Sequence, residues 1–199
     1  VGQWKRAWYY PKNNETMHDA VQRESKAARE SAGILDASTL GKIDIQGTDA
    51  SEFLNRVYTN AWSKLAIGKC RYGLMLNEDG MVYDDGVTTR LDENHYIMTT
   101  TTGGAANVLS KLEDYLQTEW PELDVYLSSV TDHYATASIC GPNGKKILNK
   151  MIPDLDLSDE NFPHMSFKNA KIGNINCRVM RISFTGEHTY EINIQANFG

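Results

Sequence analysis

The spacing of hydrophobic and polar positions along the chain predicts helices and short strands in alternation. Residues 14–32 carry apolar side chains at helical spacing and Gly33 supplies a stop, so one exposed amphipathic helix is expected there. Residues 33–47 are expected to form a loop that leads into a short strand. Thr48 is then a suitable cap for a second helix, whose apolar side lies within residues 53–57.

Turn signals separate the remaining elements, and Asp79-Gly80 and Gly173-Asn174 are the clearest of them. The pattern predicts strands at 70–76, 80–91, 95–101, 124–130, 134–141, 166–172, 175–184 and 189–194, and helices at 105–118 and from Gly141-Pro142 onward. Hairpins mixed with separated helices predict an α+β fold with antiparallel or mixed sheets rather than a doubly wound sheet. No linker divides residues 1–199, so a single domain is expected. Because the sequence ends directly after a strand, that domain is expected to be incomplete at its C-terminus.

Composition excludes several classes of protein. The chain has 26 acidic and 20 basic residues, a net charge of -6, whereas a general nucleic-acid binder needs an excess of basic residues. Its apolar runs are shorter than the roughly 20 residues that span a membrane, and its N-terminus lacks the apolar core of a signal peptide. Three widely spaced cysteines predict neither a disulfide framework nor a zinc cluster. A cytoplasmic protein without a membrane anchor is expected.

The commonest catalytic signatures do not occur in the sequence. The five histidines share no metal-ligand spacing with one another or with the cysteines, so structural or surface roles are expected for them. There is no P-loop, no dinucleotide-binding glycine fingerprint and no Gly-x-Ser-x-Gly elbow. The candidate chemistry therefore rests on isolated acidic residues within strands.

Two neighbouring aspartates, Asp84 and Asp85, stand inside a predicted strand, where successive side chains point to opposite faces. Alternation places Asp85 on the more apolar face, where an ionised carboxylate needs hydrogen bonds, a cation or a polar ligand. Asp84 falls on the polar face that it shares with Thr88 and Arg90, and it is expected to be the aspartate that faces solvent.

Two further readings stay open at this stage. Gly86 could mark a bulge that shifts the alternation by one residue, and Asp85 could be a buried aspartate that bonds backbone amides in a turn.

Glu191 alternates with Asn193 and Gln195 in the last predicted strand, and this pattern alone indicates a solvated strand face.

Three ordered blocks resemble the folate-binding aminomethyltransferase family, which includes the glycine-cleavage T protein. They are residues 36–47 (DASTLGKIDIQG), 53–91 and 181–194 (RISFTGEHTYEINI). Within that family the sequence is most similar to the C-terminal part of heterotetrameric sarcosine oxidase α subunits, at YTNAWSKL, KCRYGLM and LQTEWPELDVYLSSVT. Thr89 stands where the aminomethyltransferases usually have a tyrosine, which favours the sarcosine oxidase branch.

The resemblance implies a tetrahydrofolate pocket. By the family's pattern, Asp85 would lie beside the reactive nitrogens of the folate and act in catalysis, and Glu191 would bind the pterin ring. The other residues that the resemblance assigns to the pocket are Tyr72, Leu40, Thr100 and Phe184. A later pocket-lining arginine of the family has no counterpart in this sequence.

For function, the resemblance implies one part of a larger complex. A flavin held with other sarcosine oxidase subunits would oxidise sarcosine to an imine, and transfer of its one-carbon unit to tetrahydrofolate would give methylenetetrahydrofolate and glycine. Flavin and NAD are expected only in other parts of the complex, and the isolated chain is expected to be inactive. The alternatives are an aminomethyltransferase of the glycine cleavage system and a non-catalytic assembly domain of the folate family.

Overall fold

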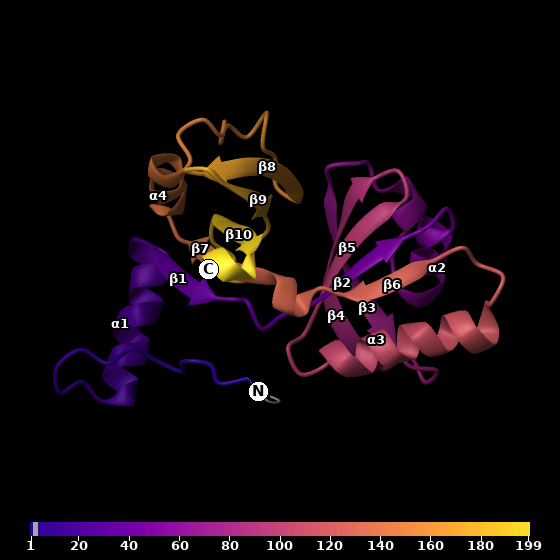
Figure 1. Cartoon of the computed structure of the whole chain (residues 1–199). Coiled ribbons are helices and arrows are strands. Elements are labelled where there is room, and N and C mark those ends of the chain that lie inside the picture. Colours follow the sequence, from indigo (N-terminus) through magenta and orange to yellow (C-terminus); the bar gives the residue numbers. More distant parts are fainter. Residues whose placement is uncertain (2–3) are drawn as a thin grey trace. The chain divides into compact units, whose positions relative to one another are not determined.

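A computed structural model describes residues 1 and 4–199 and divides them into two compact units (Figure 1). The terminal unit comprises residues 4–38 and 134–199, and the central unit comprises residues 39–133. Each unit is built on one five-stranded sheet in which every strand pair is antiparallel. The α+β prediction is confirmed, whereas the expectation of one family domain over residues 1–199 stays a prediction.

The terminal unit has the strand order β1-β7-β10-β9-β8. Its elements are α1 (Met17–Glu30), β1 (Gly33–Asp36), β7 (Tyr134–Cys140), α4 (Gly144–Met151), β8 (Ser166–Ile172), β9 (Ile175–Arg181), β10 (Thr189–Gln195) and η4 (Ala196–Phe198). One face of the sheet carries Ile139, Val179 and Ile192, which form an apolar core with Leu148 of α4. Alternation along these strands leaves the opposite face to polar residues.

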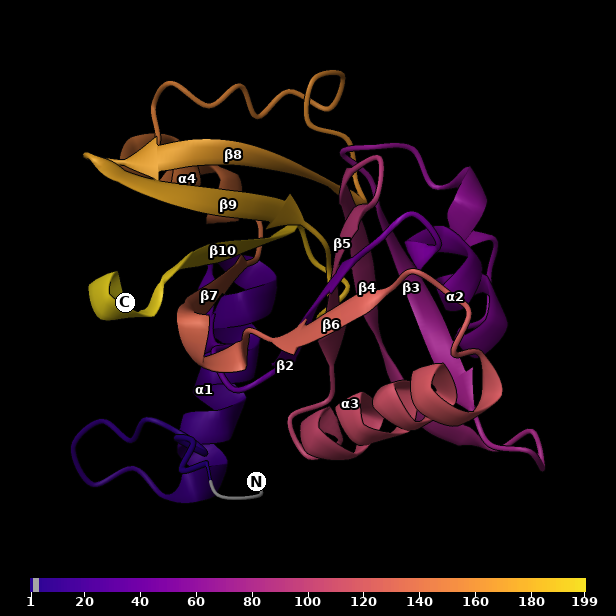
Figure 2. The same ribbon diagram turned by 45° about the vertical axis from the view of Figure 1, so that its right-hand side comes forward.

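The central unit has the strand order β3-β4-β5-β2-β6. Its elements are β2 (Gly41–Gln46), α2 (Ala50–Val57), η1 (Trp62–Lys64), β3 (Cys70–Leu76), β4 (Val82–Asp92), β5 (His95–Thr100), α3 (Ala105–Asp114), η2 (Tyr115–Glu119), β6 (Tyr126–Ser129) and η3 (Thr131–His133). Helices α2 and α3 cover one face of this sheet, where Phe53 and Leu112 pack against Ile43 and Met98 (Figure 2). That face is the apolar core of the unit.

Three local predictions are wrong. Residues 33–36 form the edge strand β1, which pairs only with β7, where a loop was expected. Helix α2 is preceded by Asp49 as its N-terminal cap residue, and Thr48 instead donates its hydroxyl to Asp124 at 3.0 Å. Helix α4 begins at Gly144, so Pro142 lies before the first turn instead of in it.

Gly86 allows β4 to approach the backbone of β5. A Cβ at this position would lie 1.8 Å from the carbonyl oxygen of Thr99, a backbone atom that cannot rotate away as a side chain would. The Thr99 hydroxyl ties the strands together here, because it accepts a hydrogen bond from the Val87 amide at 3.0 Å and donates one to the Val87 carbonyl at 3.2 Å. Gly86 thus marks a close approach of two strands and not a bulge.

The substitution Gly86→Ala is therefore expected to lower the free energy of unfolding by about 2 to 3 kcal/mol, since the backbone must shift to admit the methyl group. Urea unfolding followed by circular dichroism measures the change. Gly144→Ala is the matched control, because a Cβ there would meet its nearest atom at an ordinary 3.5 Å. Equal stability of the two variants would contradict this account of Gly86.

Candidate functional site

The two aspartates of β4 lie on opposite faces, but the face that is covered is not the predicted one. Asp84 is only 4% exposed and lies on the helix-covered side of the central sheet. Its carboxylate accepts hydrogen bonds from the Thr101 amide at 3.2 Å and the Thr101 hydroxyl at 2.5 Å. Arg90 donates instead to the carbonyl oxygens of Leu65 and Glu93. The prediction that Asp84 is the aspartate that faces solvent is wrong.

The composition of the strand explains this error. Thr88 and Arg90 look polar in the sequence, yet Thr88 is 1% exposed opposite Met98, and the Arg90 guanidinium lies 5.5 Å from the centre of the Tyr96 ring. A threonine and an arginine stem can both pack against apolar neighbours. The pairing irregularities fall between Met75 and Leu76 and between Arg90 and Asp92, so the strand keeps its alternation through Gly86.

Asp84 acts as an anchor for the start of α3. Its partner Thr101 also accepts a hydrogen bond from the Gly104 amide at 3.1 Å. A Cβ on Gly104 would lie 2.4 Å from Asp84 Oδ1, so this turn closes tightly on the carboxylate. Burial raises the pKa of Asp84, and the neighbouring Asp85 adds to that rise, while the Thr101 bonds act in the opposite direction.

Asp85 and Tyr72 form a hydrogen-bonded pair on the other face of the same sheet. The Tyr72 hydroxyl donates to Asp85 Oδ2 at 2.8 Å, and the ring is 49% exposed. This bond to the carboxylate raises the pKa of Tyr72. Asp85 is half-buried, so both polar groups can be reached by a ligand. The structure thus brings together two of the residues that the sequence comparison predicts.

Leu40 and Thr100 lie in the same unit as that pair. Thr100 is 2% exposed and pairs with Gly41, and a Cβ on Gly41 would contact both the Thr100 hydroxyl and Ala105 of α3. Thr100 therefore faces the helices, and the structure does not place it with Tyr72 and Asp85. Leu40 is half-buried, and its carbonyl oxygen accepts a hydrogen bond from Lys42 Nζ at 2.9 Å.

Lys42 is a residue that pattern reasoning missed. It is 2% exposed and lies on the sheet face opposite the helix-covered Ile43 and Ile45. A lysine is seldom buried to this extent unless its charge is paired. The sequence signal for this burial was the position of Lys42 within an alternating strand, next to apolar residues.

Glu191 and Phe184 belong to the terminal unit. Glu191 is 8% exposed, so the interpretation of its strand face as solvated is wrong. It shares a polar face with Asn193 and Thr136, where the Thr136 hydroxyl donates to Asn193 Oδ1 at 2.7 Å. Phe184 lies in the connection between β9 and β10 and is 88% exposed. A buried carboxylate on a polar strand face is suited to accept paired N–H donors.

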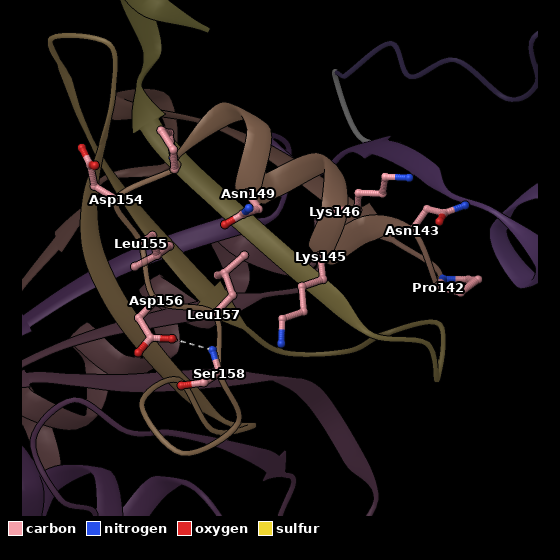
Figure 3. A pocket seen from close by; sticks show the side chains of 11 residues that line it. Pro142, Asn143, Lys145, Lys146, Asn149, Asp154, Leu155, Asp156, Leu157 and Ser158 are labelled. Carbon is pink, nitrogen blue, oxygen red and sulfur yellow. Dashed lines mark hydrogen bonds between the residues drawn. The ribbon is translucent and has the colours of Figure 1, made fainter.

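A hollow of about 790 Å³ lies in the terminal unit between α4 and residues 153–158 (Figure 3). Its carboxylate at Asp156 accepts hydrogen bonds from the Ser158 amide at 2.8 Å and Asn161 Nδ2 at 2.6 Å. These bonds lower the pKa of Asp156. The residues that line the hollow include none of the predicted site residues, and Asp156, one of the two acidic residues among them, is engaged in shaping the loop.

Within residues 1 and 4–199, no three His, Cys, Asp or Glu side chains gather as a group that could hold a metal ion. None of the helices in this part of the chain has the length and apolar character needed to cross a membrane. Cys70, Cys140 and Cys177 are buried, and the Cys70 sulfur accepts a hydrogen bond from the Thr89 hydroxyl at 3.3 Å.

Sequence comparison gives two groups of relatives, both enzymes. The chain is 55% identical over 200 residues to sarcosine oxidase subunit alpha of Corynebacterium sp. (strain P-1) and 49% identical over 202 residues to that of Rhizobium meliloti (strain 1021). Both alignments cover 100% of this chain and about a fifth of the relative, 21% and 20%. It is 33% identical over 175 residues to the aminomethyltransferase of Thermoanaerobacter sp. (strain X514), covering 87% of this chain and 46% of that protein.

Two solved structures have a similar fold. The glycine cleavage system aminomethyltransferase T from Bartonella henselae aligns with a TM-score of 0.77 and 24% identity, over 90% of this chain and 46% of that one. The second is a chain of the heterotetrameric sarcosine oxidase from Corynebacterium sp. U-96, solved in complex with pyrrole 2-carboxylate. It aligns with a TM-score of 0.60 and 14% identity, and the alignment covers 89% of this chain and 84% of that one. The GCVT N-terminal domain family matches residues 1–199. Because this match extends over the whole sequence, the chain belongs to the GCVT N-terminal domain family.

Proposed function

We propose that this chain is the tetrahydrofolate-binding part of a sarcosine oxidase α subunit. In the proposed reaction, the methylene carbon of the imine of oxidised sarcosine is transferred to tetrahydrofolate, giving methylenetetrahydrofolate and glycine. The C=N bond of the protonated imine is replaced by two C–N bonds to the folate, and the two protons lost from the folate nitrogens end on the glycine amine. Oxidation of sarcosine is assigned to a flavin in other parts of the complex.

The observation that carries this proposal is the Tyr72–Asp85 pair. A partly exposed carboxylate held by a phenol at 2.8 Å, on the sheet face away from the helices, is a suitable group to receive and return a proton. Tyr72 keeps the carboxylate oriented, and Asp85 Oδ1 is left for a ligand nitrogen. Tetrahydrofolate supplies the two nitrogens that accept the carbon.

Each unit, taken by itself, carries groups whose chemistry suits part of such a ligand. Pterin rings present adjacent N–H donors, and the buried side chain of Glu191 is a carboxylate, a group that accepts hydrogen bonds from such donors. Asp85 offers the ionisable group that proton transfer requires. Phe184, which is 88% exposed, offers an apolar ring surface.

Glu191→Gln is expected to weaken the binding of tetrahydrofolate to the full-length protein roughly 10- to 100-fold. The amide keeps the size of the side chain but replaces one acceptor oxygen with a donor, and loss of a charge-assisted hydrogen bond costs about 1.5 to 3 kcal/mol. Isothermal calorimetry measures the affinity. Glu187→Gln serves as the control. Glu187 lies in the loop before β10, and its carboxylate forms an ion pair with Arg29 at 2.6 Å. Unchanged affinity in Glu191→Gln would remove this residue from the site.

The second candidate function is that of an aminomethyltransferase, which the 33% identity to the Thermoanaerobacter enzyme favours. The two functions differ in the donor of the carbon. Purified full-length protein with its partner subunits should produce peroxide and methylenetetrahydrofolate from sarcosine. Production of methylenetetrahydrofolate only from an aminomethyl-lipoyl carrier protein would support the second candidate.

A further inference from the structure

A second hollow, of about 420 Å³, lies on the polar face of the terminal sheet. Its walls include Tyr134 of β7, Asn169 of β8, Arg178 of β9 and Asn193 and Gln195 of β10. The strand register places Asn193 directly opposite Arg178, which in turn lies opposite Asn169. Four neighbouring strands thus contribute polar side chains to one hollow, the size of which suits a small organic ligand.

Arg178 is the exceptional residue of this hollow. Its Nε atom is buried without a hydrogen-bond partner, and among residues 1 and 4–199 no acidic side chain forms an ion pair with its guanidinium. The group lies 5.5 Å from the centre of the Phe167 ring, which supports it by stacking. A guanidinium stays charged in proteins and has five donors, so leaving it half-buried and unpaired is unfavourable unless an acceptor arrives.

The walls of the hollow are complementary to an anion. The lining residues include no aspartate or glutamate, although the chain as a whole carries a net charge of -6. Asn193 is already fixed, since its Oδ1 accepts from Thr136 and its Nδ2 donates to Met180 Sδ at 3.5 Å. The amides of Asn169 and Gln195 are exposed and can add donors beside the guanidinium.

We propose that this hollow is a carboxylate-binding site in which Arg178 binds the two carboxylate oxygens through its planar fork. A carboxylate fits better than a phosphate dianion, because its planar pair of oxygens matches the edge of a stacked guanidinium and its single charge matches the single cation. The carboxylate belongs either to a free small acid or to the tail of the folate. The second source rests on the proposed function, whereas the first does not.

The experiment is a calorimetric titration of the full-length protein with glutarate, at constant ionic strength set by chloride. Wild type is expected to bind glutarate, and Arg178→Gln is expected to bind it about 10- to 100-fold more weakly. Arg178→Lys keeps the charge and most of the stem, so it guards against a folding defect and should recover only part of the affinity. Lys171→Gln is the charge-matched control, because Lys171 is exposed on β8 and does not line the hollow.

A second titration distinguishes the two sources. Tetrahydrofolate and tetrahydropteroate, which lacks the glutamate tail, are compared in wild type and Arg178→Gln. An affinity difference that disappears in Arg178→Gln assigns the site to the tail, whereas an unchanged difference together with Arg178-dependent glutarate binding assigns it to a free acid. Carboxylate binding that is equal in wild type and Arg178→Gln, or equally weakened in Lys171→Gln, would overturn the proposal. Failure of tetrahydrofolate to bind at all would instead refute the proposed function, and the glutarate titration would still stand.

Discussion

Asp85→Asn in the full-length protein is expected to slow the formation of methylenetetrahydrofolate about 100- to 10,000-fold while sarcosine oxidation continues. Removal of a positioned proton-transfer group has effects of this size on the step that it serves. The variant should fold normally, because Asp85 is half-buried and its Oδ2 accepts one hydrogen bond, from Tyr72, which the asparagine oxygen can still accept. Oxidation of the amine uses other parts of the proposed complex and should be unaffected.

Separate assays of peroxide and of methylenetetrahydrofolate measure the two half-reactions. Asp92→Asn is the matched control, because Asp92 lies at the exposed end of the same strand. Tyr72→Phe should reduce folate product less than Asp85→Asn, since it removes the group that orients the carboxylate and leaves the carboxylate itself. Equal loss of both products in Asp85→Asn would mean that the substitution damages the protein rather than one step.

Local signals in the sequence predict most elements of the fold. Strand β3 occupies residues 70–76 as predicted, because alternating residues are followed by the Asp79-Gly80 turn, where Gly80 adopts a φ of +80°. The edge strand β1 was missed because four residues are too few to show a period, and its pairing depends on β7, a hundred residues later. Strand β7, which has seven residues and also pairs with distant segments, is long enough for its sequence to predict it.

The facing of the site residues could not be predicted in the same way. Which side of β4 is buried depends on where α2 and α3 pack, and that is a property of the whole central unit. Both sheets also bury polar residues on the face opposite their apolar core, as Lys42 and Glu191 show. An alternation of apolar and polar residues normally indicates one solvated face, so this pattern concealed Glu191. Only resemblance to a family identified it.

Asp84→Ala is expected to lower the free energy of unfolding by about 1 to 3 kcal/mol. It removes from a buried position the carboxylate that accepts both hydrogen bonds from Thr101, and it releases the start of α3. Urea unfolding at neutral pH measures the loss. Asp132→Ala, at an exposed position in the same unit, should change stability by less than about 0.5 kcal/mol. A similarly small effect of Asp84→Ala would show that the turn holds without the carboxylate.

The pH dependence of unfolding gives an independent test of the burial of Asp84. Its pKa in the folded state is raised above the ordinary value of 3.8, chiefly by desolvation, so the folded protein binds this proton more tightly than the unfolded chain does. The resulting stabilisation is fully present below the unfolded pKa and is lost as the pH rises through the raised folded pKa. Asp84→Asn does not titrate. Its free energy of unfolding should therefore increase relative to that of wild type as the pH rises above about 4. An identical pH dependence of the two proteins would mean that Asp84 is hydrated and that burial does not raise its pKa.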